Sequence, residues 1–204
     1  MVYAGLAAYT VWQWLPDQAT DERHRRTGWL AAASMLLNAT WLLVTRQGWI
    51  WLSVVVIAAL VVVLGVLVQR LTERPSFGFV ETLVVDGTFG AYLGWVCVAT
   101  CANVTAALVS SGVDPGPPAS EVWAVAVLAL VAGVGVLLAR RLEGRYAVAL
   151  AIAWGLLWIA VGRVGDEPQS TATAWAAVAA AVVVVVATAR QRARVRGPVD
   201  DTTT

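Results

Sequence analysis

Long apolar runs alternate along the chain with short segments rich in charge, Pro and Gly. The run 88–109 holds 22 positions without a charge, enough to cross the hydrocarbon core of a bilayer as a helix. Comparable runs predict further spans, and the complete set is 2–15, which is short for a full crossing, 27–45, 49–68, 88–109, 122–139, 146–162 and 171–189. The pattern therefore predicts an all-α, polytopic helical membrane protein of about seven spans.

Breaks between the runs divide the chain into regions. A Pro-Gly-Pro-Pro sequence within 113–120 cannot continue a helix, so this segment is the expected linker between a first region, 1–112, and three further transmembrane helices in 121–190. Residues 191–204 begin as a basic segment and end as a polar tail, which we expect to be disordered and cytoplasmic. The segment 71–87 predicts the longest loop, either an ordinary one or a short amphipathic piece on the membrane surface.

Composition narrows the class of function. Apolar residues make up 59% of the 204 positions and charged residues 13%, which excludes an ordinary soluble domain and makes the lipid bilayer the main partner. A formal net charge of +1 predicts no nucleic-acid partner. All thirteen acidic residues fall outside the predicted spans, which argues against a proton relay or ion-coupled transport.

Few side chains suggest chemistry. The sequence shows no nucleophile with a neighbouring His and no paired carboxylates, so we predict no catalytic residue, no metal ligand and no cofactor, and leave open whether the chain is an enzyme. The one histidine, His24, lies among Arg and acidic residues and is expected in a solvated loop. Cys97 and Cys101 share one predicted span and are expected to be small packing residues.

Arg residues are distributed unevenly between the segments that join the spans. All fourteen basic residues are Arg, and with seven crossings twelve of them fall on the side that holds the C-terminus. Cytoplasmic segments carry the excess of basic residues in membrane proteins. We therefore expect a multi-pass protein of a bacterial plasma membrane, with its C-terminus in the cytoplasm and Met1 outside.

Two of the spans carry a stripe of polar and aromatic residues. Their members recur at spacings that stack side chains along one side of a helix. The stripe in 88–109 is Tyr92, Trp95, Ala99 and Asn103, and the stripe in 27–45 is Ser34, Asn38, Trp41 and Thr45. A side-chain amide is costly against lipid, so the stripes either join helices by hydrogen bonds or line a ligand pocket. The span 49–68 has no polar group in its middle and is expected to face mainly lipid.

Both stripes lie in motifs that resemble the tryptophan-rich sensory protein (TspO/MBR, translocator protein) family. The sequence AYLGWVCVATCAN at 91–103 is similar to the family's last core helix, and LNATW at 37–41 is similar to its Leu-Asn-x-x-Trp helix. The two motifs cover the first half of the chain. The family's first helix and its Pro-bearing loop have no counterpart, and the three helices of 121–190 are additional to the family's bundle.

The resemblance implies a membrane sensor or translocator that binds a flat hydrophobic ligand, such as a tetrapyrrole, a sterol-like molecule or a lipid, in a cleft within the bundle. The residues that it implies as ligand-binding are Asn38, Trp41, Tyr92, Trp95, Ala99, Asn103 and, from the first segment, Tyr3. Two alternatives stay open: a membrane enzyme that modifies a porphyrin or lipid, and a structural module without a ligand. The Gly90-x-x-x-Gly94 motif allows two helices to approach closely and suggests a homodimer.

Overall fold

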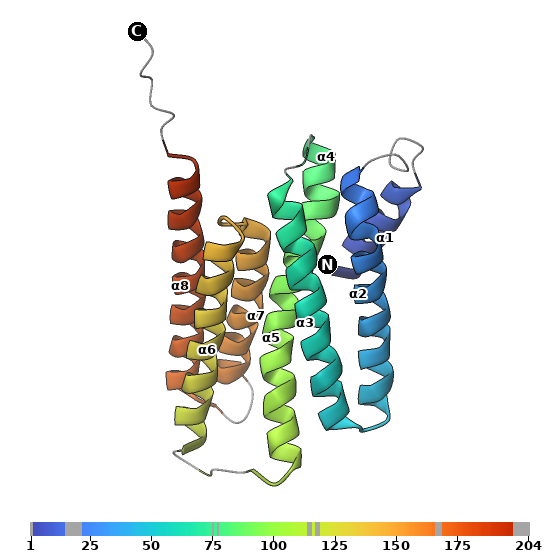
Figure 1. Ribbon diagram of the computed structural model, residues 1–204. Helices are drawn as coiled ribbons and strands as arrows, with labels where there is room; N and C mark the ends of the chain where they lie inside the picture. Colours follow the sequence, from blue (N-terminus) through green and yellow to red (C-terminus); the bar gives the residue numbers. More distant parts are fainter. Residues whose placement is uncertain are drawn as a thin grey trace.

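The computed structural model describes residues 2–14, 22–74, 76, 78–113, 116, 119–165 and 169–197, without the side chains of Glu22 and His24. Every regular element of the described chain is a helix (Figure 1), which confirms the all-α prediction. The expectations for Met1, for the solvation of the His24 side chain and for the polar tail beyond 197 lie outside the described residues.

The helices differ in their capacity to span a membrane. In chain order they are α1 (Val2–Gln13), α2 (Glu22–Arg46), α3 (Ile50–Glu73), α4 (Phe79–Glu81), the π-helix η2 (Thr82–Gly87), α5 (Thr88–Ser110), α6 (Ala119–Arg141), α7 (Tyr146–Gly165) and α8 (Thr171–Val195). Six described stretches are long and apolar enough to cross a membrane: α2, α3, α4 through α5, α6, α7 and α8. The 12 residues of α1 extend about 18 Å, less than the roughly 30 Å of the hydrocarbon core. The expected set of about seven spans therefore consists of six candidate crossings and one short helix.

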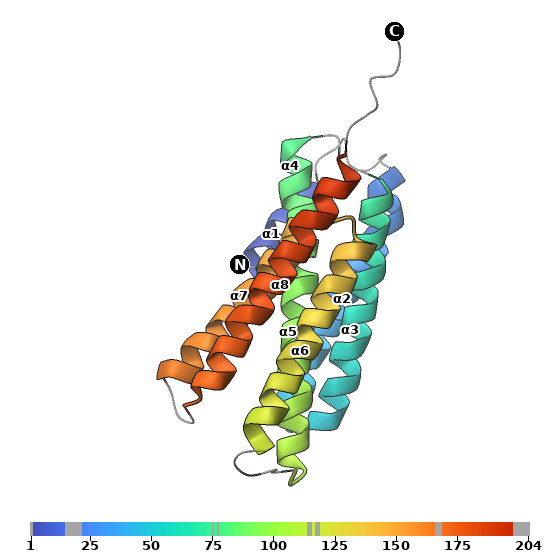
Figure 2. The same ribbon diagram turned by 90° about the vertical axis from the view of Figure 1, so that its left-hand side faces the viewer.

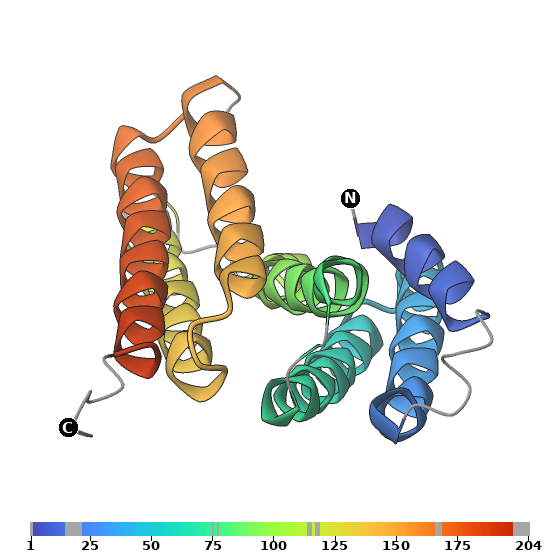
Figure 3. The same ribbon diagram turned by 90° about the horizontal axis from the view of Figure 1, so that it is seen from above.

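The helix α5 lies at the centre of the bundle. Seen from above, α1, α2 and α3 lie on one side of it and α6, α7 and α8 on the other (Figure 3). α5 packs against α3 in the first group and against α7 in the second. Figure 2 shows α7 and α8 tilted relative to α3 and α5. The regions on either side of the expected linker at 113–120 therefore pack directly against each other through α5.

The helix α3 has a packed side as well as an exposed one, so the expectation that it faces mainly lipid stays a prediction. It packs against both α2 and α5, and its buried residues are Ser53, Ile57, Leu60, Leu64, Leu67, Val68 and Leu71. Val55 and Val62 are exposed on its other side. A helix with Val, Leu and Ile on every side has no contrast between its protein-facing and lipid-facing sides, so the sequence could not show which side is buried.

The segment 71–87 is largely helical, so the expectation of an ordinary loop is wrong. α3 continues to Glu73, and the helix resumes at Phe79. Glu81 and Asp86 consequently lie within a candidate span, which contradicts the expectation that all acidic residues lie outside the spans. Charge together with nearby Pro and Gly favoured a loop, but buried partners neutralise these two carboxylates.

The charged segment before the second predicted span is also helical in part. α2 begins at Glu22, before the predicted start at 27, so His24 lies in a helix and not in a loop. The earlier start also brings Arg23 into the bundle, where its side chain is buried.

Glycines allow α5 and α7 to approach closely. A Cβ atom at Gly90 would lie 2.9 Å from the Cβ atom of Ala147, and one at Gly94 would overlap the carbonyl oxygen of Val148. The Gly90-x-x-x-Gly94 motif is therefore used for a contact within the chain. It gives no support to a homodimer, which stays a prediction.

Candidate functional site

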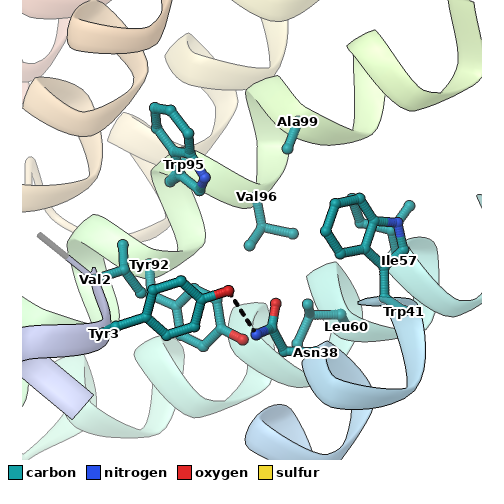
Figure 4. Close-up of a pocket in the computed structure, with 10 residues that line it drawn as sticks. All are labelled: Val2, Tyr3, Asn38, Trp41, Ile57, Leu60, Tyr92, Trp95, Val96 and Ala99. Atoms are coloured by element: carbon teal, nitrogen blue, oxygen red, sulfur yellow. Dashed lines mark hydrogen bonds between the residues drawn. The ribbon is translucent and has the colours of Figure 1, made fainter. Parts of the chain in front are cut away.

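A small cavity lies among α1, α2, α3 and α5 (Figure 4). Its volume is about 70 Å³, and it is lined by Val2, Tyr3, Asn38, Trp41, Ile57, Leu60, Tyr92, Trp95, Val96 and Ala99. Six of the seven residues that the resemblance implies as ligand-binding belong to this lining: Tyr3, Asn38, Trp41, Tyr92, Trp95 and Ala99. The fold thus brings together side chains that the sequence could place only on separate helices.

One side of the cavity is polar. The amide nitrogen of Asn38 donates a hydrogen bond to the hydroxyl oxygen of Tyr3 over 3.3 Å, drawn in Figure 4. The buried Tyr92 hydroxyl donates to the backbone carbonyl of Ser34, also over 3.3 Å. The first bond joins α1 to α2 and the second joins α5 to α2, so the polar side chains are held by contacts between helices.

Trp41 contributes an unused hydrogen-bond donor. Its indole nitrogen Nε1 is buried and has no hydrogen-bond partner in the described part of the chain. A buried polar group without a partner costs roughly 1–3 kcal/mol, and such groups are rare in native proteins. The Trp41 ring lines the cavity, and Figure 4 shows its nitrogen on the side of the ring that faces away from Val96 and Asn38.

The rest of the lining is apolar and partly exposed. Figure 4 shows Trp95 and Trp41 on opposite sides of Val96. Trp95 is 45% exposed and Tyr3 is 63% exposed, whereas Tyr92 is 2% exposed. The described lining contains no charged residue. Two exposed rings therefore border a cavity whose surface suits an uncharged, apolar group.

Asn103, the seventh predicted residue, is not brought to the cavity. Its amide nitrogen donates to the hydroxyl of Ser53 on α3 over 3.0 Å, and both residues are buried. In the second stripe, the Thr45 hydroxyl donates to the Trp41 carbonyl oxygen of its own helix over 2.7 Å. Each stripe thus lines the cavity with only some of its residues. In one stripe these are Asn38 and Trp41, and in the other they are Tyr92, Trp95 and Ala99, whereas Asn103 joins two helices by a hydrogen bond.

The site offers stacking and hydrogen bonding as its means of recognition. No group of three or more His, Cys, Asp or Glu side chains that could hold a metal ion occurs within the described ranges. Cys97 and Cys101 are unpaired thiols, one buried and one partly buried, and both pack in the hydrophobic core.

A buried charge cluster that the sequence did not reveal lies next to the start of α5. Arg23 of α2 pairs through Nη1 with Glu81 and through Nη2 with both carboxylate oxygens of Asp86, at 2.7 and 2.9 Å. Arg145, in the turn before α7, donates from Nη1 to Asp86 at 2.6 Å. Arg23, Glu81 and Asp86 are buried. Two guanidinium groups and two carboxylates therefore neutralise one another away from water.

The partners in this cluster are far apart in the sequence. Arg23 and Glu81 are separated by 58 positions, and Arg145 also donates from Nε to the Thr72 hydroxyl at 2.6 Å. The signal available in the sequence was the apolar content of 79–85, FVETLVV, which is unusual for a solvated loop. That signal predicts burial of the segment, but it does not identify the arginines that neutralise it.

Comparison with known families identifies the chain. A family model described as TSPO-like protein matches residues 1–190, a region that includes both polar stripes and extends through α6 and α7 into α8. No curated protein and no solved structure matches the chain. The family match covers most of the sequence, and the described residues hold six candidate spans. The chain is therefore a multi-pass membrane protein that belongs to the TSPO-like protein family.

Proposed function

We propose that the protein is a membrane sensor or translocator that binds a flat hydrophobic ligand, such as a tetrapyrrole, a sterol-like molecule or a lipid, in the cavity among α1, α2, α3 and α5. The observation that supports this function is the lining: four aromatic rings and several aliphatic side chains surround a single amide. Aromatic rings stack on flat apolar molecules, and a few polar groups fix their orientation.

Binding requires the cavity to enlarge. Its volume of about 70 Å³ is well below the roughly 300–1,000 Å³ of typical ligand pockets. Tyr3 and Trp95 are the exposed aromatic residues of the lining, so their rings can rotate outward without opening the core. Val2 and Tyr3 belong to α1, which packs on α5 and η2. We infer that α1 covers the ligand.

Porphyrin titration of the purified protein in detergent tests the proposal, followed by Trp quenching and by the shift of the porphyrin absorption band. Ala99→Phe fills the cavity from α5 and is expected to weaken binding about tenfold, or about 1.4 kcal/mol. Ala102→Phe is the matched control, because Ala102 is an exposed residue of the same helix outside the lining. Trp95→Ala removes a stacking surface and should weaken binding by about 1 kcal/mol.

The outcomes separate the three candidate functions. Equal affinities for wild type and Ala99→Phe would place the ligand elsewhere. A wild-type protein that binds neither a porphyrin nor a fluorescent sterol would favour a structural module. Progressive loss of porphyrin absorption after saturation would indicate an enzyme that modifies its ligand.

We further infer that the protein lies in the plasma membrane with its Arg-rich end in the cytoplasm. This end is where α2 and α7 begin and where α3, α6 and α8 end (Figure 1). Its arginines are Arg23, Arg25, Arg26, Arg70, Arg74, Arg140, Arg141, Arg145, Arg190, Arg192, Arg194 and Arg196, whereas Arg46 and Arg163 lie at the opposite end. The excess of basic residues supports the cytoplasmic assignment. From α2 onward, successive connecting segments lie on alternate sides of the membrane, and this order is the same whether or not α1 crosses.

A further inference from the structure

A second, larger pocket lies at the Arg-rich end. It has a volume of about 380 Å³ and separates η2 and the end of α3 from the turn between α6 and α7. We call it the seam pocket, because it lies between the two groups of helices that flank α5. Several spans begin or end at this level (Figure 1), so the pocket lies near the boundary between hydrocarbon and lipid headgroups.

The seam pocket has one apolar and one polar wall. Phe79 and Leu83 form part of its lining and are 81% and 60% exposed. Thr72, Arg145 and Arg192 contribute hydroxyl and guanidinium groups to the same lining. Exposed apolar side chains next to guanidinium groups suit a ligand that is itself amphipathic, with an anionic group and a hydrocarbon chain.

The lining of the pocket holds two basic and two acidic residues, which are Arg145, Arg192, Asp86 and Glu143. The carboxylate of Asp86 is already neutralised, because Arg23 and Arg145 both pair with it. Glu143 lies in the exposed turn. In the full sequence, the segments on the side of the Arg-rich end carry twelve Arg and nine Asp or Glu residues. The surplus of basic residues attracts anions to the mouth of the pocket.

Arg192 is held at the pocket by backbone geometry. Gly144 has a positive φ of 71°, and a Cβ atom there would lie 2.7 Å from the backbone nitrogen of Arg192. This close approach brings the turn onto α8, where Arg192 Nη1 donates to the Glu143 carbonyl at 3.4 Å. Arg192 is half-buried, whereas Arg190 and Arg194 on the same helix are exposed and outside the lining.

We propose that the seam pocket binds the phosphate group of an anionic phospholipid. Arg192 contacts the phosphate oxygens, for which a guanidinium group has a fitting donor geometry. Arg145 contributes only its Nη2 group, because its Nη1 and Nε already donate to Asp86 and Thr72. The acyl chain leaves the pocket along Phe79 and Leu83 and continues into the bilayer. Basic pockets between transmembrane helices bind lipid headgroups in this manner. The proposal is independent of the aromatic cavity, which lies among other helices.

Native mass spectrometry of the full chain in detergent, with added phosphatidylglycerol or phosphatidylcholine, tests the proposal. Wild type should retain phosphatidylglycerol in preference to phosphatidylcholine. Arg192→Gln should weaken phosphatidylglycerol retention about fivefold or more, whereas Arg190→Gln and Arg194→Gln, the matched controls, should change it less than about twofold. Glu143→Gln should strengthen retention, because it removes a negative charge from the lining.

Three results would overturn the proposal. Equal losses for Arg192→Gln and its two controls would mean diffuse attraction to the basic surface without a site. Unchanged retention in Arg192→Gln would place the lipid elsewhere. Glycerol 3-phosphate is the soluble probe. If it binds as tightly as phosphatidylglycerol, and if Leu83→Asn weakens the binding of neither molecule, the pocket would be assigned to a free phosphate ester. Arg192 is partly exposed, so its substitution should preserve the fold, and an unchanged thermal unfolding midpoint of Arg192→Gln in detergent checks this.

Discussion

Arg145 Nη1 lies 2.6 Å from Asp86 Oδ1, and this ion pair ties the turn before α7 to η2, which continues directly into the central helix α5. Asp86 also accepts two hydrogen bonds from Arg23 of α2. One carboxylate therefore connects both groups of helices. The glycine contact between α5 and α7 lies on the same helix, so packing and charge act together to hold the two regions in one arrangement.

Asp86→Asn is expected to destabilise the protein by about 3–5 kcal/mol, because it leaves the buried guanidinium group of Arg23 and the partly buried one of Arg145 without full neutralisation. Denaturant titration in mixed micelles, followed by Trp fluorescence, measures the change. Glu73→Gln is the control, since Glu73 is exposed at the end of α3 and its loss should shift the free energy of unfolding by less than about 0.5 kcal/mol. Similar values for both variants would show that the cluster contributes little.

Gly94→Ala is expected to cost about 1–3 kcal/mol or more, because the added methyl group meets the Val148 carbonyl oxygen and forces α5 and α7 apart. Gly65→Ala provides the comparison. Nothing lies within 4 Å of a Cβ atom at Gly65, so this change should be neutral or stabilise α3 by up to about 1 kcal/mol. If Gly94→Ala is equally well tolerated, the close contact of α5 with α7 does not exist in the membrane.

The bond between Asn103 and Ser53 can be measured with a double-mutant cycle of Asn103→Ala and Ser53→Ala. We expect a coupling free energy of about 0.5–1 kcal/mol, typical of hydrogen bonds between transmembrane helices. The reference cycle combines Ser53→Ala with Thr105→Ala. The Thr105 hydroxyl donates to the Cys101 carbonyl of its own helix, so the second cycle should give a coupling near zero. Comparable coupling in both cycles would contradict a specific α3–α5 bond.

Cysteine labelling in whole cells checks the orientation, in a background where Cys97 and Cys101 are replaced by Ala. Val113→Cys and Gly165→Cys lie at the end opposite the Arg-rich end and should react with an impermeant reagent. Thr202→Cys should react only after the membrane is permeabilised. The reverse pattern would put the Arg-rich end outside the cell.

The sequence identified the cavity residues because their types contrast with their surroundings. Asn38 and Trp41 recur at helical spacing within one apolar run, and Trp95 and Ala99 do so in another, so the faces that bear them could be assigned without a structure. Periodicity could not separate Asn103 from this set. Whether a stripe residue borders a cavity or bonds a neighbour depends on Ser53, which lies on a helix that otherwise has no polar stripe.

The charge cluster and the role of α3 could not be predicted, for two different physical reasons. The uniformly apolar side chains of α3 are equally compatible with lipid and with protein, so its sequence does not indicate which side of the helix packs against the other helices. Glu81 and Asp86 resemble loop residues until Arg23 and Arg145 are placed beside them. Pairing of this kind depends on the fold as a whole, and local sequence patterns do not determine it.

The π-helical turn η2 sets the directions in which the side chains before and after it point around the helix axis. Asp86 within it faces the arginines, and Tyr92, six residues later, faces the cavity. Each residue advances an α-helix by about 100°, and π-turns are places where an α-helix accommodates an extra residue. An in-frame gain or loss of one codon between these two positions therefore rotates one set of side chains away from its partners. The gene can vary in length far more freely at 113–120 than in this short interval.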